Sequence, residues 1–240
     1  MKLGIVAALP REAQTILPSA QRCSQIYSFG EDAWLAIAGE GAENAQRACT
    51  RLLSTGVTAL LSWGIAAALD PHLQAGTLLL PDKVIDGMAT AGSKRKSVYP
   101  IDKNWRTLLL NNLEGRFPVC RDQLMSMDQP LGNTKKKQQL YEESKACAVD
   151  GESVAIARCA RDAGLAFAVI RVVAAPASLR SVRIADERGN LPLQDALTGL
   201  VLKPHHIPAF LKRSLYSRYA LNVLRRAVLA LDGRLADASA

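Results

Sequence analysis

The sequence is poor in the residues that build several common kinds of site. Aromatic residues make up 5% of the 240 positions, there are three histidines, and the five cysteines are scattered without any CxxC spacing. No run of 18 apolar residues is free of charge, which argues against a membrane-spanning helix, and the N-terminus does not have the pattern of a signal peptide. These absences argue against a metal site and a disulfide framework, so we expect a cytoplasmic protein with reduced thiols and no metal ligands.

Acidic residues are missing from one long stretch near the C-terminus. The formal net charge is +8, and the segment Lys203–Arg226 supplies +6 of it without a single aspartate or glutamate. Apolar residues recur there at helical spacing, so a basic helical extension over residues 192–232 is predicted. Two interpretations stay open: the helices bind an anionic membrane surface, or their apolar face covers the sheet while the bases are solvated. Nucleic acid is disfavoured, because no aromatic stacking platform lies among the bases.

What the chain does contain in quantity is aliphatic residues, and their pattern predicts the fold. Around Lys145–Ser178 a short apolar run is followed by a helical pattern ending at Gly164, and then by the buried run Leu165–Ala175. Strand, helix and strand within about 30 residues predict a βαβ unit. Lys2–Leu9 and Thr58–Trp63 are further buried strands. We therefore expect one α/β domain over residues 1–240, with three layers and a central, mostly parallel, twisted sheet.

Several polar or glycine residues follow these strands directly, where open parallel sheets bind their ligands. Pro10-Arg11-Glu12 opens a helix. Glu12 is therefore either part of a ligand site or simply a carboxylate that the helix dipole favours in the first turn. The loop Gly39-Glu40-Gly41 precedes the helical pattern Glu43–Thr55, where backbone N–H groups can approach an anion, although a simple tight turn explains it as well. The run Lys135–Lys137 is expected to be a solvated helix face.

The segment AVDGESVAIARCARDAGLAFAVIRVVAAPAS resembles the signature of the nucleoside phosphorylase and nucleosidase superfamily, roughly A-V-[DE]-M-E-x-x-A-x-A followed by a strand ending in R-x-[IV]-[SA]-D. The matching positions are Asp150, Glu152, Ala155, Ala157 and Arg171. MKLGIVAALPREA and the G-x-G-x-x-N-A pattern at residues 39–45 resemble other parts of the same family.

The chain departs from the family at four positions. Gly151 stands in place of a methionine, and Ala175 in place of a terminal aspartate. In GIAAALDP, residues 64–71, Ala67 and Ala68 replace two glycines of the family's G-x-A-G-G-L-D-P. The family's glycines there let the backbone pass close to the ribose and the purine.

The resemblance implies an enzyme that cleaves the N-glycosidic bond of a purine nucleoside, with no cofactor and with water or phosphate as the nucleophile. Glu152 would hold the ribose hydroxyls and Glu12 would act on the attacking water or the ribose. Ala175 cannot supply the acid that protonates the leaving base, a loss worth about 10²–10⁴-fold in rate. The enzyme could be slow, another acid such as Asp186 could serve, or the change could be an engineered one. The expected site comprises Glu12, Gly41, Gly64, Ala66, Ala67, Gly151, Glu152 and Ala175.

The C-terminal segment narrows the resemblance further. Asp195-Ala196-Leu197, Lys203-Pro204 and Leu224-Arg225-Arg226 resemble the hopanoid-associated phosphorylases, which are linked to removing adenine from adenosylhopane. This implies a lipid-linked adenosine substrate and a place on the inner face of the membrane. We also expect a homo-oligomer. The alternative is a catalytically impaired or non-catalytic protein of the same fold that binds nucleosides or lipids, because the four departures surround one expected pocket.

Overall fold

The computed structural model describes residues 2–87, 97–128, 133–179, 207–231 and 235 of the chain. The expected helix Pro192–Leu202, the residue Asp186 and most of the tail motif lie outside them. The described helices are α1 (Pro10–Ala13), α2 (Ala42–Leu53), α3 (Lys103–Leu113), α4 (Thr134–Ser144), α5 (Ser153–Asp162) and α7 (Ile207–Leu231). The strands are β1 (Leu3–Ala7), β2 (Ile26–Phe29), β3 (Ala33–Ile37), β4 (Ala59–Ala68), β5 (Leu78–Leu79), β6 (Lys83–Asp86), β7 (Val98–Pro100), β8 (Val119–Cys120), β9 (Leu124–Ser126), β10 (Ala148–Asp150) and β11 (Ala166–Ala175).

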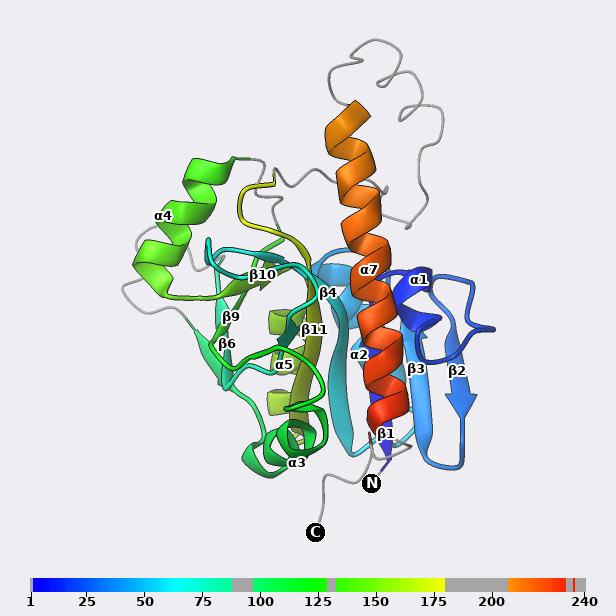
Figure 1. Cartoon of the computed structure of the whole chain (residues 1–240). Coiled ribbons are helices and arrows are strands. Elements are labelled where there is room, and N and C mark those ends of the chain that lie inside the picture. Colours follow the sequence, from blue (N-terminus) through cyan, green and yellow to red (C-terminus); the bar gives the residue numbers. More distant parts are fainter. Residues whose placement is uncertain (1, 88–96, 129–132, 180–206, 232–234, 236–240) are drawn as a thin grey trace.

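The described strands form one mixed, mostly parallel sheet, as the sequence predicts (Figure 1). The strand order is β2-β3-β1-β4-β10-β9-β6-β7, and β11 pairs with both β4 and β5, with β8 beyond β5. Strand β1 is parallel to both β3 and β4, and β4 is parallel to β11. The predicted strands Lys2–Leu9 and Leu165–Ala175 correspond to β1 and β11, each buried along almost its whole length. Continuous apolar runs form such strands because helices cover both faces of a parallel sheet, so that side chains on either face are buried.

The long central strand β4 differs from the sequence prediction. The apolar run Thr58–Trp63 predicts that the strand ends at Trp63, but β4 continues through Gly64 to Ala68. The extension forms because β11 continues to pair with it as far as Ala67, opposite Ala175, and because β10 pairs with Ala67 and Ala68. Strand β10 is antiparallel to β4 whereas β11 is parallel to it. The predicted parallel βαβ unit is therefore wrong in one respect: its two strands both flank β4 but run in opposite senses.

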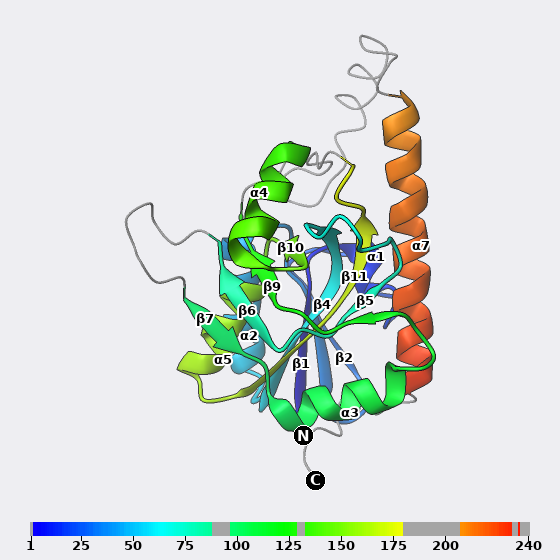
Figure 2. The same ribbon diagram turned by 60° about the vertical axis from the view of Figure 1, so that its left-hand side comes forward.

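Helices cover both faces of the sheet (Figures 1 and 2). Helices α2 and α5 lie together on one face, and α7 runs along the other beside α1. Helix α7 presents Ala220, Val223, Leu224, Ala227 and Leu231 to the core, all buried. Its small alanines let the helix approach the sheet closely. Among the described residues no helix has the length and apolar character needed to cross a membrane.

Two other expected strands are interrupted, and one expected solvent-facing residue is buried. The predicted strand Thr77–Ile85 is split into β5 and β6 around Pro81, which has no N–H to donate to a ladder. The stretch Val119–Met127 likewise forms β8 and β9.

Lys137, predicted to be solvated, is fully buried, and its Nζ donates to the Leu179 carbonyl at 2.6 Å.

Candidate active site

Glu12 lies in α1, directly after β1, and its carboxylate points back into the protein. Oε2 accepts hydrogen bonds from the backbone N–H groups of Ala8 and Leu9 at 3.0 and 2.9 Å, and Oε1 accepts one from Ile65 on β4 at 2.9 Å. Glu12 is only 2% exposed. Burial raises the pKa of the Glu12 carboxyl, against the opposing effects of Arg171 and these backbone N–H groups. The helix dipole alone does not explain a carboxylate so far from solvent, because α1 has only four residues and the dipole effect is worth at most about 2 kcal/mol even in partly buried geometries.

Arg171 on β11 is the cation at the centre of the site, and it is 1% exposed. Its Nη1 lies 4.0 Å from Oε1 of Glu12, its Nη2 lies 3.3 Å from Oε2 of Glu152, and its Nε lies 3.0 Å from Oδ2 of Asp150. Burial disfavours the charged guanidinium, but the three carboxylates outweigh it and raise the pKa of Arg171. One positive charge therefore faces three acidic groups, and the cluster is negative when all three are ionised.

Glu152 occupies the N-cap position of α5 and links the Gly41 loop to this cluster. Its Oε1 accepts a hydrogen bond from the N–H of Gly41, 3.0 Å away, in the loop between β3 and α2. Burial raises the pKa of Glu152 to about 7, with Asp150 and Glu12 adding to the rise and with Arg171 and the Gly41 N–H opposing it. The group consequently changes charge near neutral pH.

A chain of hydroxyl groups supports the cluster from the sheet side. The Nη2 of Arg171 donates to Oγ of Ser62 at 2.9 Å, and Ser62 hydrogen-bonds Ser153 at 2.9 Å. The Ser153 hydroxyl donates in turn to Oδ2 of Asp150. Ser62, Ser153, Asp150 and Arg171 are not among the site residues predicted from the sequence. Arg171 gave a visible signal, since it is the single charge inside the apolar run of β11 and a buried charge needs partners.

At two glycines of the predicted site a side chain would collide with a neighbouring charged group. Gly64 has φ +153°, and a methyl group there would overlap both Oε1 of Glu12 and Nη1 of Arg171. Gly41 has φ +97°, and a methyl group there would lie 2.8 Å from Oδ1 of Asp128. The sequence gives no sign of Asp128, whose carboxylate is beside the Gly41 loop.

The four departures from the family pattern lie together at the ends of three neighbouring strands. Ala175 on β11 is paired with Ala67 on β4, and Ala67 and Ala68 pair with Val149 and Ala148 of β10. Gly151 directly follows β10, and the nearest atom to a side chain built there is the Met127 carbonyl oxygen at 3.9 Å. Ala66 is buried one residue before Ala67.

The structure thus joins Glu12 and Glu152 through Arg171, links Glu152 to Gly41 by a hydrogen bond, and places Gly64 against Glu12 and Arg171. Ala66, Ala67, Gly151 and Ala175 lie further along, near the ends of β4, β10 and β11. No group of three His, Cys, Asp or Glu residues in the described ranges is arranged to hold a metal ion. The protein is thus a three-layer α/β protein whose buried carboxylate cluster lies at the carboxyl end of β1, the kind of position at which open α/β sheets bind small ligands.

The comparison with known proteins identifies the family within that class. The model of the phosphorylase superfamily matches residues 2–193, so the chain belongs to the phosphorylase superfamily. No curated protein sequence matches significantly.

Solved structures of the same superfamily share the fold over the whole chain. The 5′-methylthioadenosine/S-adenosylhomocysteine nucleosidase of Helicobacter pylori superposes with a TM-score of 0.74 at 17% identity, covering 98% of this chain and 99% of that one. Futalosine hydrolase of the same organism gives 0.74 at 17% identity and covers 98% of both chains. The Neisseria meningitidis nucleosidase, in complex with methylthio-immucillin-A, gives 0.73 at 17% identity, covering 98% of this chain and 100% of that one.

Proposed function

We propose that this chain cleaves the N-glycosidic bond of a purine nucleoside, with an adenosine derivative as substrate. The observation that carries the proposal is the cluster of Glu12 and Glu152 around Arg171, at the carboxyl end of β1 and beside the middle of β4 and β11, in a chain of this family. An ionised Glu152 accepts hydrogen bonds from ribose hydroxyls, and these strengthen as positive charge develops on the sugar.

Glu12 is suited to act as the base that receives a proton from the attacking nucleophile. Burial raises the pKa of its carboxyl, which makes the ionised group a better proton acceptor. Three backbone N–H groups fix its orientation, so little reorganisation is needed when a water molecule approaches Oε1 or Oε2.

We favour water over phosphate as the nucleophile because the surroundings are acidic. Glu12, Asp150 and Glu152 share one arginine, and the Asp128 carboxylate approaches Gly41, whose N–H is already engaged by Glu152. A phosphate dianion placed near this loop would be repelled by the same carboxylates. A neutral water molecule meets no such repulsion.

The 5′ substituent is proposed to be large and apolar, as in adenosylhopane. Two observations support this: the space beside Gly151, and the resemblance of the C-terminal segment to the hopanoid-associated phosphorylases. A second candidate function is nucleoside binding without turnover, which Ala175 favours because alanine cannot protonate the leaving base.

The test is adenine release, measured by chromatography, from adenosine, 5′-methylthioadenosine and a 5′-alkyl adenosine, with and without phosphate. We expect release without phosphate, highest with the alkyl substrate, and a loss of about 100-fold or more in Glu12→Gln. Dependence on phosphate would contradict the choice of water. Saturable binding of the nucleosides without any adenine release would establish the binding protein instead.

A further inference from the structure

All five cysteines are thiols in the structure, and four of them form two interacting pairs. Cys120, the last residue of β8, interacts with Cys147, which directly precedes β10. Cys49 on α2 interacts with Cys159 on α5. Neither pair belongs to the cluster around Arg171, so the proposed function gives these thiols no role.

Asp122 brings the thiols of Cys120 and Cys147 together. The Cys120 thiol donates to Oδ2 of Asp122 at 3.8 Å, and the Cys147 thiol donates to the Asp122 carbonyl at 3.5 Å. The backbone N–H of Cys147 also donates to the Gln123 carbonyl at 3.0 Å. The residues that follow β8 and the residue that precedes β10 therefore lie side by side, which is the first requirement for a disulfide between them.

The two thiols of this pair differ in exposure and in acidity. Cys120 is half-buried and is followed by the exposed residues Arg121 and Asp122, whereas Cys147 is 1% exposed. The interaction with Cys147 lowers the pKa of the Cys120 thiol, against the opposing effects of burial and of the Asp122 carboxylate. The same interaction and burial raise the pKa of Cys147. Because the thiolate is the nucleophile, Cys120 is the residue that reacts first with a reagent from solution.

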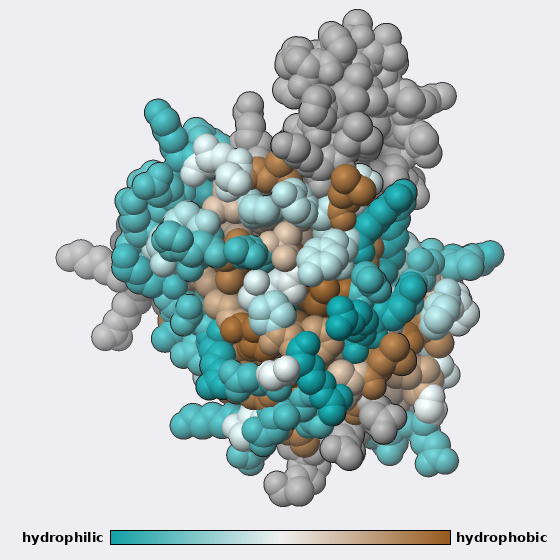
Figure 3. All heavy atoms as spheres, in the orientation of Figure 1, coloured by the Kyte–Doolittle hydropathy of each residue, from teal (hydrophilic) through white to brown (hydrophobic). Residues whose placement is uncertain are grey.

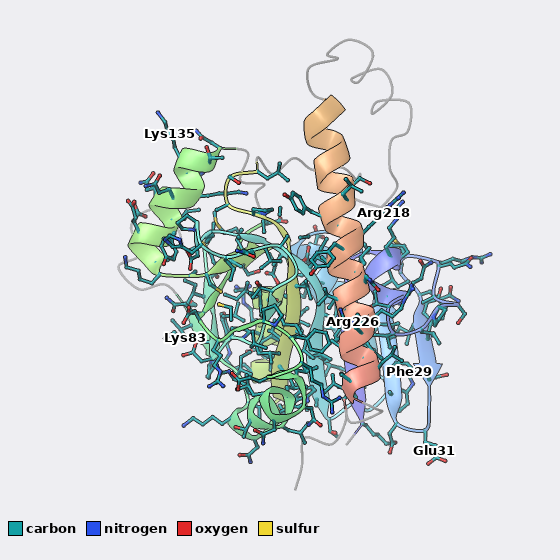
Figure 4. All side chains as sticks on the ribbon, viewed as in Figure 1. Phe29, Glu31, Lys83, Lys135, Arg218 and Arg226 are labelled. Atoms are coloured by element: carbon teal, nitrogen blue, oxygen red, sulfur yellow. The ribbon has the colours of Figure 1, made fainter. Side chains whose placement is uncertain are left out.

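The surface near this pair is hydrophilic. The side-chain amide of Gln123 donates to the carbonyl of Ser144, the last residue of α4. The side chains over α4 are mainly teal in Figure 3, and Lys135 of this helix points outward in Figure 4. A small charged molecule can therefore approach this side of the protein through solvated groups.

We propose that Cys120 and Cys147 form a reversible disulfide by exchange with a low-molecular-weight disulfide, with Cys120 as the attacking residue and Cys147 as the resolving one. In the first step the Cys120 sulfur bonds to one sulfur of the small disulfide, whose S–S bond breaks and releases a thiolate. That thiolate takes the proton of the Cys147 thiol. The Cys147 sulfur then bonds to Sγ of Cys120, the mixed disulfide breaks and a second thiolate leaves. Two protein thiols are oxidised and one small disulfide is reduced to two thiols.

This inference goes beyond the proposed function, and its test needs no turnover. The Cys147 carbonyl accepts hydrogen bonds from the N–H groups of Leu69 and Asp70, at 2.9 and 3.0 Å, just after the end of β4. Strand β10 then leads from Cys147 to Asp150, which contacts Arg171. The disulfide would thus fasten to β8 the start of a strand that carries part of the candidate site.

The test is incubation of the folded full chain with glutathione disulfide, followed by alkylation of the remaining thiols, tryptic digestion and mass spectrometry. Cleavage after lysine and arginine puts each cysteine in a different peptide, namely residues 23–47, 48–51, 117–121, 146–158 and 159–161. We expect peptide 117–121 to be linked to peptide 146–158, and the link to disappear in excess reduced glutathione.

Single substitutions assign the two roles. Cys147→Ser should stop the exchange at the first step, so that Cys120 retains one glutathione, and Cys147→Ala should do the same without a buried hydroxyl. Cys120→Ser should leave residue 147 at least about tenfold slower to react, because a buried thiol of raised pKa is a poor nucleophile. Cys23→Ser, which changes a half-buried thiol outside the pair, is the matched control and should leave the link intact.

Three results would overturn the proposal. One is the absence of a link between the two peptides in the folded chain, and another is a link that forms only after unfolding in urea. The third is addition of glutathione to Cys147 in Cys120→Ser at the rate at which the wild type forms its link, which would show that Cys120 is not the attacking residue.

Discussion

Arg171 is the residue on which the geometry of the candidate site depends. It reaches Glu12 just after β1, and Asp150 and Glu152 at the junction of β10 and α5, and its Nη1 also lies 3.4 Å from the Ile65 carbonyl. A buried ion cluster of this kind is weak evidence for stability, because the desolvation of each charge offsets much of the attraction. Its clearer effect is to fix the relative positions of the carboxylates.

Glu152 makes stability depend on pH in a direction opposite to that of most carboxylates. Burial raises its pKa from 4.5 to about 7, so between those values the folded chain retains a proton that the unfolded chain has released. By linkage, the free energy of unfolding falls as pH rises through this window. A pKa difference of one corresponds to about 1.36 kcal/mol, so this group contributes about 3 kcal/mol to the pH dependence.

We therefore expect the free energy of unfolding, measured in urea, to fall more between pH 5 and pH 8 in the wild type than in Glu152→Gln, whose residue 152 cannot titrate. Arg171 keeps Asp150 and Glu12 as partners in the variant, so the guanidinium is not left unpaired. Identical pH profiles for the two proteins would show that the pKa of Glu152 is not raised.

Ala175 leads to a prediction of gained activity. Its position at the end of β11, paired with Ala67, puts it beside the other departures from the family pattern. We expect Ala175→Asp to raise adenine release by at least about tenfold, because a general acid contributes about 10²–10⁴-fold. Ala175→Asn is the matched control, since it has nearly the same size and cannot donate an acidic proton. Equal rates in the two variants would mean that another group protonates the base.

At the scale of elements, the sequence predicts strands correctly where the apolar run and the strand coincide. β1 and β11 are within two residues of the prediction at each end, because both are buried runs bounded by helix or turn signals. The prediction for β4 is too short, since Gly64 indicates a turn, whereas pairing with β11 and β10 keeps the backbone extended. Pairing between distant strands is a tertiary effect that local propensity does not contain.

The candidate site is predictable to a similar extent. Glu12 and Glu152 follow or begin elements that the sequence delimits, and the family resemblance adds the glycines. Ser62, Ser153 and Asp128 are missed because serines and aspartates are common, and nothing in the chain order brings them near Arg171 or Gly41. Only the fold places Ser62 within reach of Arg171, at 2.9 Å from Nη2.

The Gly64 segment of β4 gives a prediction that separates backbone strain from a steric collision. Gly64→Ala would adopt an unfavourable positive φ and would also push a methyl group into Glu12 and Arg171. Gly56→Ala, at φ +79°, would meet nothing within 4 Å, so only the backbone would be strained. We expect about 1–2 kcal/mol of destabilisation for Gly56→Ala from its positive φ, and a larger loss, with loss of activity, for Gly64→Ala. Thermal unfolding and adenine release measure the two effects, and equal destabilisation would argue against the collision.

At the scale of the whole molecule, the chain continues well past the end of the family match at residue 193. The last described part is nevertheless integrated with the rest. Helix α7 packs along β11 and β4. Just beyond its C-terminal end, the Leu235 carbonyl accepts a hydrogen bond at 3.1 Å from the indole N–H of Trp105, a fully buried residue of α3. We therefore expect α7 to unfold together with the sheet rather than as a separate unit.

Leu224 provides the test of that cooperativity. It is fully buried on the core side of α7, so Leu224→Ala removes core packing and should lower the free energy of unfolding of the entire chain by about 2–5 kcal/mol. Leu229→Ala makes the same change at a leucine that is 72% exposed on the same helix, and should fall within about 0.5 kcal/mol of the wild type. Unfolding in urea would be followed both by the fluorescence of the three tryptophans, of which Trp63 and Trp105 are fully buried, and by far-ultraviolet circular dichroism. If α7 belongs to one cooperative unit, both signals shift together in Leu224→Ala. Different transition midpoints for the two signals would show that α7 detaches before the sheet unfolds.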